Sequence, residues 1–202
     1  KKAEIIAKSW REQRDIKSLM MFLSNIGVST SLSHKIFKVY KNDAIAKIRR
    51  NPYGLIDDVY GIGFKTADTI AMKIGADKES FQRCRAGIFY TLESAAANEG
   101  HCYLPKNELI EKSSKILEID DVKIAATYDY LICHEELIAE NKTQVYLPCF
   151  YHAETGIANK IKEILNASIF AKFAPKRLDA EIEKIQDENK INYDDFQKEA
   201  IK

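Results

Sequence analysis

The amino-acid sequence predicts a mainly α-helical fold, in which two helical hairpins in tandem are followed by a small α+β segment and a helical linker. Three observations predict it. Apolar residues recur at helical spacing through most of the 202 residues. A tight Gly-Ile-Gly turn at residues 61–63 separates two such stretches and has a degenerate copy at residues 27–29. Short runs typical of β-strands occur between residues 100 and 148.

The first hairpin is expected within residues 1–50. Residues 1–18 are basic and helical in pattern, and Leu32, Ile36 and Phe37 mark a helix after the turn at residues 27–29. A connecting helix is expected over residues 42–50. It should end there because the residue before Pro52 avoids the α conformation.

The second hairpin turns at Gly61-Ile62-Gly63. A turn this tight is expected to need Gly at both corners, because Gly tolerates a positive φ, and Ile62 should point inward. Lys65 or Thr66 would lie in the first turn of the next helix, where backbone N–H groups have no partner within the helix. These free donors and the positive end of the helix dipole predict an anion site.

The two turns form an internal repeat with a constant offset of 34 residues. Gly27 aligns with Gly61, and Val28 aligns with Ile62, whereas Ser29 stands where the second copy has Gly63. Two such hairpins can bury each other's apolar faces. Residues 1–50 also hold 12 Lys or Arg and 4 Asp or Glu, a net charge of +8, while the remainder carries −7. This asymmetry is typical of a surface that binds a polyanion, although charged runs are often only solvated helix faces.

Residues 59–68, Val-Tyr-Gly-Ile-Gly-Phe-Lys-Thr-Ala-Asp, resemble the helix-hairpin-helix DNA-binding motif. Together with Asn51-Pro52-Tyr53, the stretch to Gly75 resembles the amino-terminal region of RecD-like DNA helicases, the family of the exodeoxyribonuclease V alpha subunit. The fold class implied is a tandem helix-hairpin-helix domain followed by a winged-helix-like α+β segment and a helical linker. The DNA-binding residues implied are Gly61, Ile62, Gly63, Phe64, Lys65, Thr66, Gly27, Val28, Ser29 and Lys35.

The resemblance also implies what the whole protein does. It would be an ATP-dependent helicase that uses ATP and Mg and acts in DNA recombination and repair, with DNA and helicase–nuclease subunits as partners. Residues 191–202 resemble the segment before the phosphate loop of superfamily 1 helicases, in which Gln197 would contact adenine. An ordinary capped helix start, with Asn192 or Asp194 as the cap, is the alternative for these residues. This fragment itself is expected to hold no cofactor.

Residues 79–150 are expected to follow the order helix, strand, helix, helix and hairpin, which is that of a winged helix. The predicted helices cover residues 81–99, 106–117 and 122–133, the last capped by Asp120 or Asp121. A helix over 150–171, a basic linker over 172–177 and a charged helix over 178–188 follow. The predicted domains are 1–78 (tandem hairpins), 79–150 (winged-helix-like), 151–190 (helical linker) and 191–202 (truncated start of the motor).

Several classes of protein are disfavoured. No segment has the ~20 apolar residues of a membrane helix, and no apolar leader is present, so we expect a cytoplasmic piece of a longer protein. The four cysteines lack the regular spacing of zinc ligands and are expected to be reduced thiols. No phosphate loop is complete, because Phe64 precedes Lys65 where that loop needs Gly. We therefore expect no catalysis by this fragment, and the alternative to DNA binding is a module that docks another protein.

Overall fold

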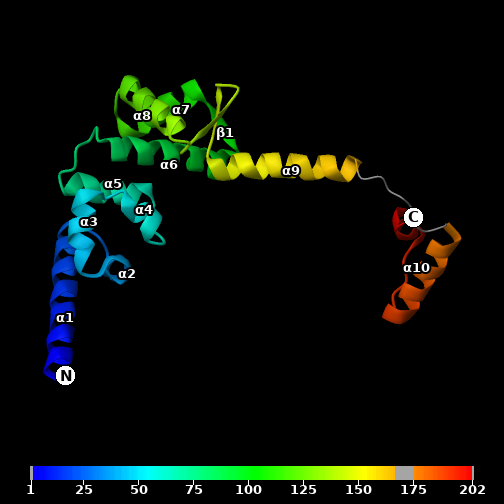
Figure 1. Cartoon of the computed structure of the whole chain (residues 1–202), viewed down its shortest axis with the longest axis horizontal. Helices are drawn as coiled ribbons and strands as arrows, with labels where there is room; N and C mark the ends of the chain where they lie inside the picture. The colour runs from blue at the N-terminus through cyan, green and yellow to red at the C-terminus, as the bar shows by residue number, and fades with distance from the viewer. Residues whose placement is uncertain (1, 167–174, 202) are drawn as a thin grey trace. The chain divides into compact units, whose positions relative to one another are not determined.

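The computed structural model describes residues 2–166 and 175–201, which divide into two compact units, Lys1–Thr155 and Gly156–Lys202. Helices dominate both units, as the sequence predicts, and a single small sheet lies among the described residues of the first (Figure 1). The finer division into four domains stays a prediction.

The tandem hairpins occupy the amino-terminal half of the first unit. Their elements are α1 (Lys2–Asn25), α2 (Thr30–Tyr40), a 3-10 turn (Lys41–Asp43), α3 (Ala44–Arg50), α4 (Gly54–Asp58) and α5 (Phe64–Lys73). Helix α1 extends beyond the predicted residues 1–18 and runs to Asn25, because Leu19 and Leu23 continue its buried face. Helix α3 ends at Arg50, two residues before Pro52, as predicted.

Equivalent positions of the two hairpins are also buried to the same extent. Ile36 in α2 and Ile70 in α5, which stand 34 residues apart, are both fully buried. Ser33 and Ala67 occupy the equivalent positions one turn earlier and are buried as well. The two hairpins therefore share one core, which neither would form alone.

The second segment has the predicted order of elements. It comprises α6 (Phe81–Glu99), β1 (Tyr103–Pro105), α7 (Lys106–Leu117), α8 (Asp121–Cys133), β2 (Ile138–Glu140) and β3 (Gln144–Tyr146). The antiparallel sheet has the order β1-β3-β2, with Leu104 and Ala139 both opposite Val145. The sheet thus joins the hairpin after α8 to the strand that follows α6.

Local capping explains the helix limits in this segment. The Ser80 hydroxyl accepts a hydrogen bond from the Arg83 amide, and Gly100 ends α6 with a φ of 74°. The Asp120 carboxylate caps α8 through the Val122 amide at 2.8 Å. Helices α6 and α7 approach closely at Gly87, where an added Cβ would lie 2.5 Å from Leu117 Cδ1.

Three further helices complete the described chain: α9 (Pro148–Asn166), α10 (Pro175–Asn189) and α11 (Asp195–Ile201). The predicted end of the first of these helices at residue 171 and residues 172–174 of the predicted linker lie outside the described residues. Helix α10 begins at Pro175, earlier than predicted, in keeping with the tolerance of proline in a first helical turn. None of the described helices has the length and apolar composition that crossing a membrane requires.

Candidate nucleic-acid interface

The second hairpin has the features expected of an anion site. Gly61 has a φ of 91°, and Ile62 is buried beneath the turn, as predicted. Gly63 is the N-cap of α5, and no side chain caps this helix end. The Thr66 amide donates to the Gly63 carbonyl at 3.1 Å, so the donors at this helix end are the amides of Phe64 and Lys65, with the positive end of the helix dipole behind them.

The expectation that both glycines are needed for the turn is wrong. Gly63 has φ −100° and ψ 177°, an extended conformation that any residue adopts. An added Cβ at Gly63 would meet nothing within 4 Å, whereas one at Gly61 would lie 3.2 Å from Lys35 Nζ. Only Gly61 is required by the backbone. The absence of a side chain at Gly63 instead leaves open space directly in front of α5.

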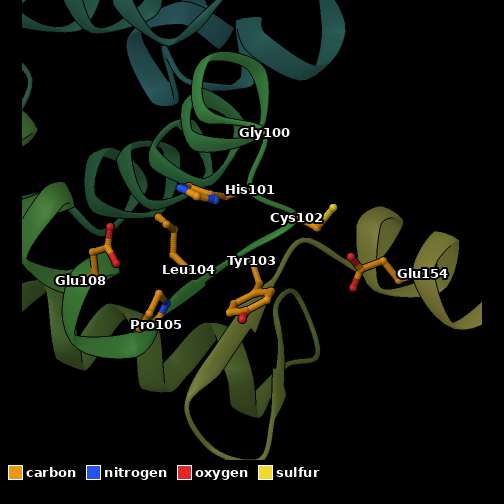
Figure 2. A pocket seen from close by; sticks show the side chains of 8 residues that line it. All are labelled: Gly100, His101, Cys102, Tyr103, Leu104, Pro105, Glu108 and Glu154. Atoms are coloured by element: carbon orange, nitrogen blue, oxygen red, sulfur yellow. The ribbon is translucent and has the colours of Figure 1, made fainter.

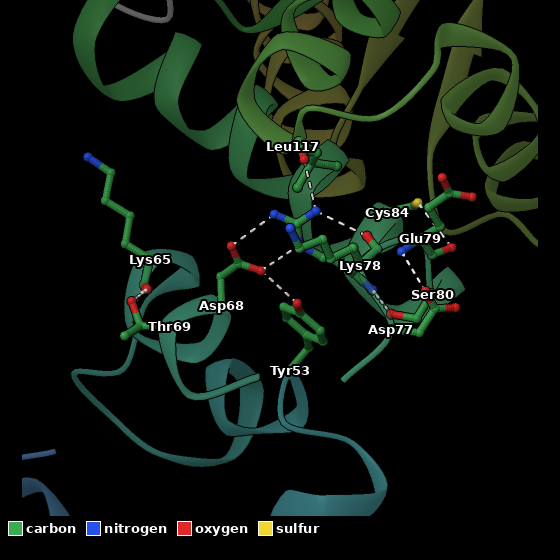
Figure 3. Close-up of polar contacts among 11 residues, drawn as sticks. Tyr53, Lys65, Asp68, Thr69, Asp77, Lys78, Glu79, Ser80, Cys84 and Leu117 are labelled. Carbon is green, nitrogen blue, oxygen red and sulfur yellow. Dashed lines mark hydrogen bonds and ion pairs between the residues drawn. The ribbon is translucent and has the colours of Figure 1, made fainter. Parts of the chain in front are cut away.

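The predicted residues of the second turn divide by burial. The side chains of Ile62 and Phe64 are 4% and 7% exposed, and Phe64 stacks on Tyr90 with ring centroids 4.9 Å apart. These two residues can offer only backbone groups to a ligand. Lys65 is exposed and Thr66 is half-buried. Figure 3 shows the Lys65 side chain extending away from the polar contacts of its neighbours.

The first hairpin repeats the geometry with one change. Gly27 has a φ of 76°, Val28 is half-buried, and Ser29 is the N-cap of α2. Ser29 Oγ accepts a hydrogen bond from the Leu32 amide at 3.3 Å. The equivalent amide of the second hairpin, that of Thr66, donates instead to the Gly63 carbonyl at 3.1 Å. The two hairpins therefore differ in the side chain that stands before the helix, which is a serine hydroxyl in one and absent in the other.

A lysine from each copy binds the turn of the other. Lys35 Nζ of α2 donates to the Tyr60 carbonyl at 3.4 Å, and Lys73 Nζ of α5 donates to the Ile26 carbonyl at 2.8 Å. The two carbonyls precede Gly61 and Gly27 and stand 34 residues apart. Lys35, one of the predicted DNA-binding residues, thus lies directly on the second turn. Lys73 was missed, because its sequence position shows only a cation at a helix end.

A buried ion pair fixes α5 to the second segment. Arg83 Nε and one terminal nitrogen donate to both oxygens of Asp68, at 2.8 and 3.1 Å. The other terminal nitrogen donates to the carbonyls of Lys78 and Leu117. The Tyr53 hydroxyl donates to Asp68 at 2.6 Å (Figure 3). Sequence patterns do not reveal such a network, since its three side chains, Tyr53, Asp68 and Arg83, follow one another at intervals of 15 residues along the chain.

The charges of this network shift its proton affinities. Burial alone would raise the pKa of Asp68, but the hydrogen bonds from Arg83 and Tyr53 outweigh it and lower the pKa. The hydrogen bond to Asp68 raises the pKa of Arg83. Burial and the same carboxylate raise the pKa of Tyr53. Asp68 is therefore an anion that positions α5, and its charge is matched inside the protein.

Of the four cysteines, only Cys102 lines the open pocket of about 440 Å³ that it shares with His101 and Glu154. Figure 2 shows Cys102 directed toward Glu154, while the His101 ring extends in the opposite direction. The hydrogen bond to Glu154 and burial raise the pKa of the Cys102 thiol. Among the described residues, no group of three or more His, Cys, Asp or Glu side chains is placed to hold a metal ion.

Gln197 lies at the start of α11. Its backbone amide donates to Asp194 Oδ1 at 2.9 Å, and its side-chain oxygen accepts from the Asp194 amide at 3.1 Å. This reciprocal pair is a capping box, the structural role that the sequence also allowed. A contact between Gln197 and adenine stays a prediction.

The fold and the paired turns define a class of protein: a tandem helix-hairpin-helix module joined to a small α+β segment. Residues 12–103 match the family described as the ATP-dependent RecD2 DNA helicase HHH domain. The chain is also 24% identical over 181 residues to the ATP-dependent RecD2 DNA helicase of Deinococcus radiodurans. This alignment covers 79% of this chain and 24% of that protein. The resemblance to the amino-terminal helix-hairpin-helix region of RecD-like helicases is confirmed. The chain spans about a quarter of the length of this curated relative.

Proposed function

We propose that this chain is the DNA-binding amino-terminal part of an ATP-dependent RecD-like helicase that acts in recombination and repair. It binds the phosphate backbone without reading sequence, through the Phe64 and Lys65 amides that follow Gly63 and through the charge of Lys65. The observation that carries this proposal is the uncapped start of α5 behind an exposed glycine. The first hairpin contributes through Gly27, Val28 and Ser29, more weakly because its own serine caps α2.

The motor lies in the part of the protein beyond this chain. ATP and Mg would serve that motor, and Gln197 would contribute an adenine contact to it. The winged-helix-like segment would hold the hairpins against the rest of the protein or against helicase–nuclease subunits. Docking with little DNA contact remains the second candidate, and the net charge of −7 over residues 51–202 favours it.

The test is binding of a fluorescein-labelled duplex, followed by anisotropy at several salt concentrations. Neutralising about four or five phosphates predicts a loss in affinity of about 10²–10³ between 50 and 200 mM salt. Changing the duplex sequence should leave the affinity unchanged.

The decisive variant is Gly63→Val, which has room within the fold but fills the space in front of α5. It should keep its circular dichroism spectrum and lose binding. Gly156→Val is the matched control, since Gly156 also has open space around it and an ordinary φ. Undiminished binding by folded Gly63→Val would refute the hairpin site and favour the docking module.

A further inference from the structure

A groove of about 450 Å³ opens beside the first hairpin, away from the start of α5. It lies between α1, α3 and the turn that follows α5. Its lining is apolar at Phe22, Ile26, Ile74 and Ala76, with two cations, Arg49 and Lys73. The volume is within the range of sites that hold small organic ligands.

The chemistry of the lining specifies a flat, anionic ligand. The Arg49 guanidinium lies over the Phe22 ring, 5.6 Å from its centroid, so a cation and an aromatic ring stand together in the lining. Lys73 donates one hydrogen bond to the Ile26 carbonyl. Because an ammonium group has three donors, two of them are left for a ligand. None of the residues that line the groove is acidic. Aromatic and guanidinium planes beside an ammonium group are the groups that bind a nucleobase and its phosphate.

We propose that this groove binds an unpaired nucleotide of DNA, with the base against Arg49 and Phe22 and the phosphate near Lys73. The proposal rests on the DNA-binding function proposed above and adds a substrate preference to it. The groove adjoins the first hairpin, where the Ser29 side chain caps α2, while no side chain caps the start of α5 in the second hairpin. The module would therefore hold duplex backbone at one turn and a single strand at the other.

The experiment compares a labelled duplex with and without a short tail of unpaired adenosines, at one fixed salt concentration. The 202-residue chain should bind the tailed duplex about tenfold more tightly than the blunt duplex, because stacking of one base on such groups contributes about that factor in affinity. Arg49→Ala should remove this advantage and leave most of the binding to blunt duplex. Arg50→Ala is the matched control, because it removes an exposed cation from the same helix and should keep the advantage.

A fluorescent base analogue in the tail, 2-aminopurine, reports stacking independently of charge. Its emission should fall on binding to the parent chain and to Arg50→Ala, and should be unchanged with Arg49→Ala. Equal affinities of the parent chain for tailed and blunt duplex would overturn the groove proposal while leaving the hairpin function intact. Absence of binding to either DNA would refute the proposed function itself.

A capped peptide that combines aspartates with a terminal phenylalanine tests the other ligand class that fits these groups. If the peptide binds the parent chain but not Arg49→Ala, and the adenosine tail adds no affinity, the groove is a protein-docking site and the proposal is wrong. Displacement of the stacked 2-aminopurine by single-stranded oligonucleotide, but not by the peptide, would support it.

Discussion

Replacing Arg83 by Ala should destabilise the protein strongly, because it removes a buried charge that holds several partners. The Arg83 side chain is 9% exposed and that of Asp68 is 20% exposed, so neither charge is well hydrated. Four hydrogen bonds from one guanidinium would be lost, including those to the carbonyls of Lys78 and Leu117. Breaking a buried ion pair costs about 3–5 kcal/mol, and the partial exposure of Asp68 favours the lower end. At about 3 kcal/mol, the melting temperature should fall by about 6–12 °C.

The assay is urea and thermal unfolding followed by circular dichroism, with Arg85→Ala as the matched control. Arg85 is on the same helix and pairs with Glu136 at 2.6 Å, but the two side chains are 37% and 30% exposed. Loss of this exposed ion pair should lower the free energy of unfolding by at most about 1 kcal/mol. A double-mutant cycle with Asp68→Asn should show strong coupling to Arg83. If Arg83→Ala costs no more than Arg85→Ala, the network does not fix α5 to the second segment.

The same network predicts a dependence of stability on pH. Asp68 has a lowered pKa in the folded state, so its contribution is fully present above the unfolded value of about 3.9 and is lost as the pH falls through the folded pKa. The difference in stability between the parent chain and Arg83→Ala should therefore narrow as the pH is lowered below about 4. A constant difference down to the acid transition would contradict this assignment.

The remaining predictions concern the turns, the enzyme activity and the carboxyl-terminal helix. Lys65→Ala should reduce the slope of log affinity against log salt by about one, measured by anisotropy, and an unchanged slope would remove Lys65 from the interface. Gly61→Ala should cost about 1–2 kcal/mol in urea unfolding, because its φ is 91° and its Cβ would approach Lys35, while Gly63→Ala should be nearly neutral. The purified chain should hydrolyse no ATP above a heat-inactivated control, and turnover would show a catalytic site in these residues. In the longer protein, Gln197→Ala should lower ATP hydrolysis relative to a nucleotide without adenine, and an unchanged ratio would leave Gln197 as a helix cap alone.

Much of the fold could be predicted because its signals are local. The limits of α6 and α7 match the prediction residue for residue, since Ser80, Gly100 and Pro105 mark their ends. The repeat with offset 34 correctly placed Gly27 and Gly61 in equivalent turns with positive φ. These features depend on capping and periodicity, which a sequence shows directly.

Features that depend on distant contacts could not be predicted. Lys35 and Lys73 bind carbonyls 25 and 47 residues away, and no periodicity relates those positions. Apolar spacing predicted α9, yet Ile157, Ile164 and Leu165 are more than half exposed. An amphipathic pattern shows that a helix has an apolar face, but it does not show what covers that face.

The two hairpins are therefore similar in backbone and different in chemistry. Lys35 and Lys73 tie each turn to the other copy, so the turns are held in a fixed relation before any ligand binds. Fixed donors bind an anion without the entropic cost of ordering them, which matters for a site that relies on a few backbone amides. The Ser29 side chain caps α2, whereas Gly63 places no side chain in front of α5. Under the proposed function, the difference between Ser29 and Gly63 gives the second hairpin the stronger phosphate contact and leaves the first, with its adjoining groove, for a different part of the DNA.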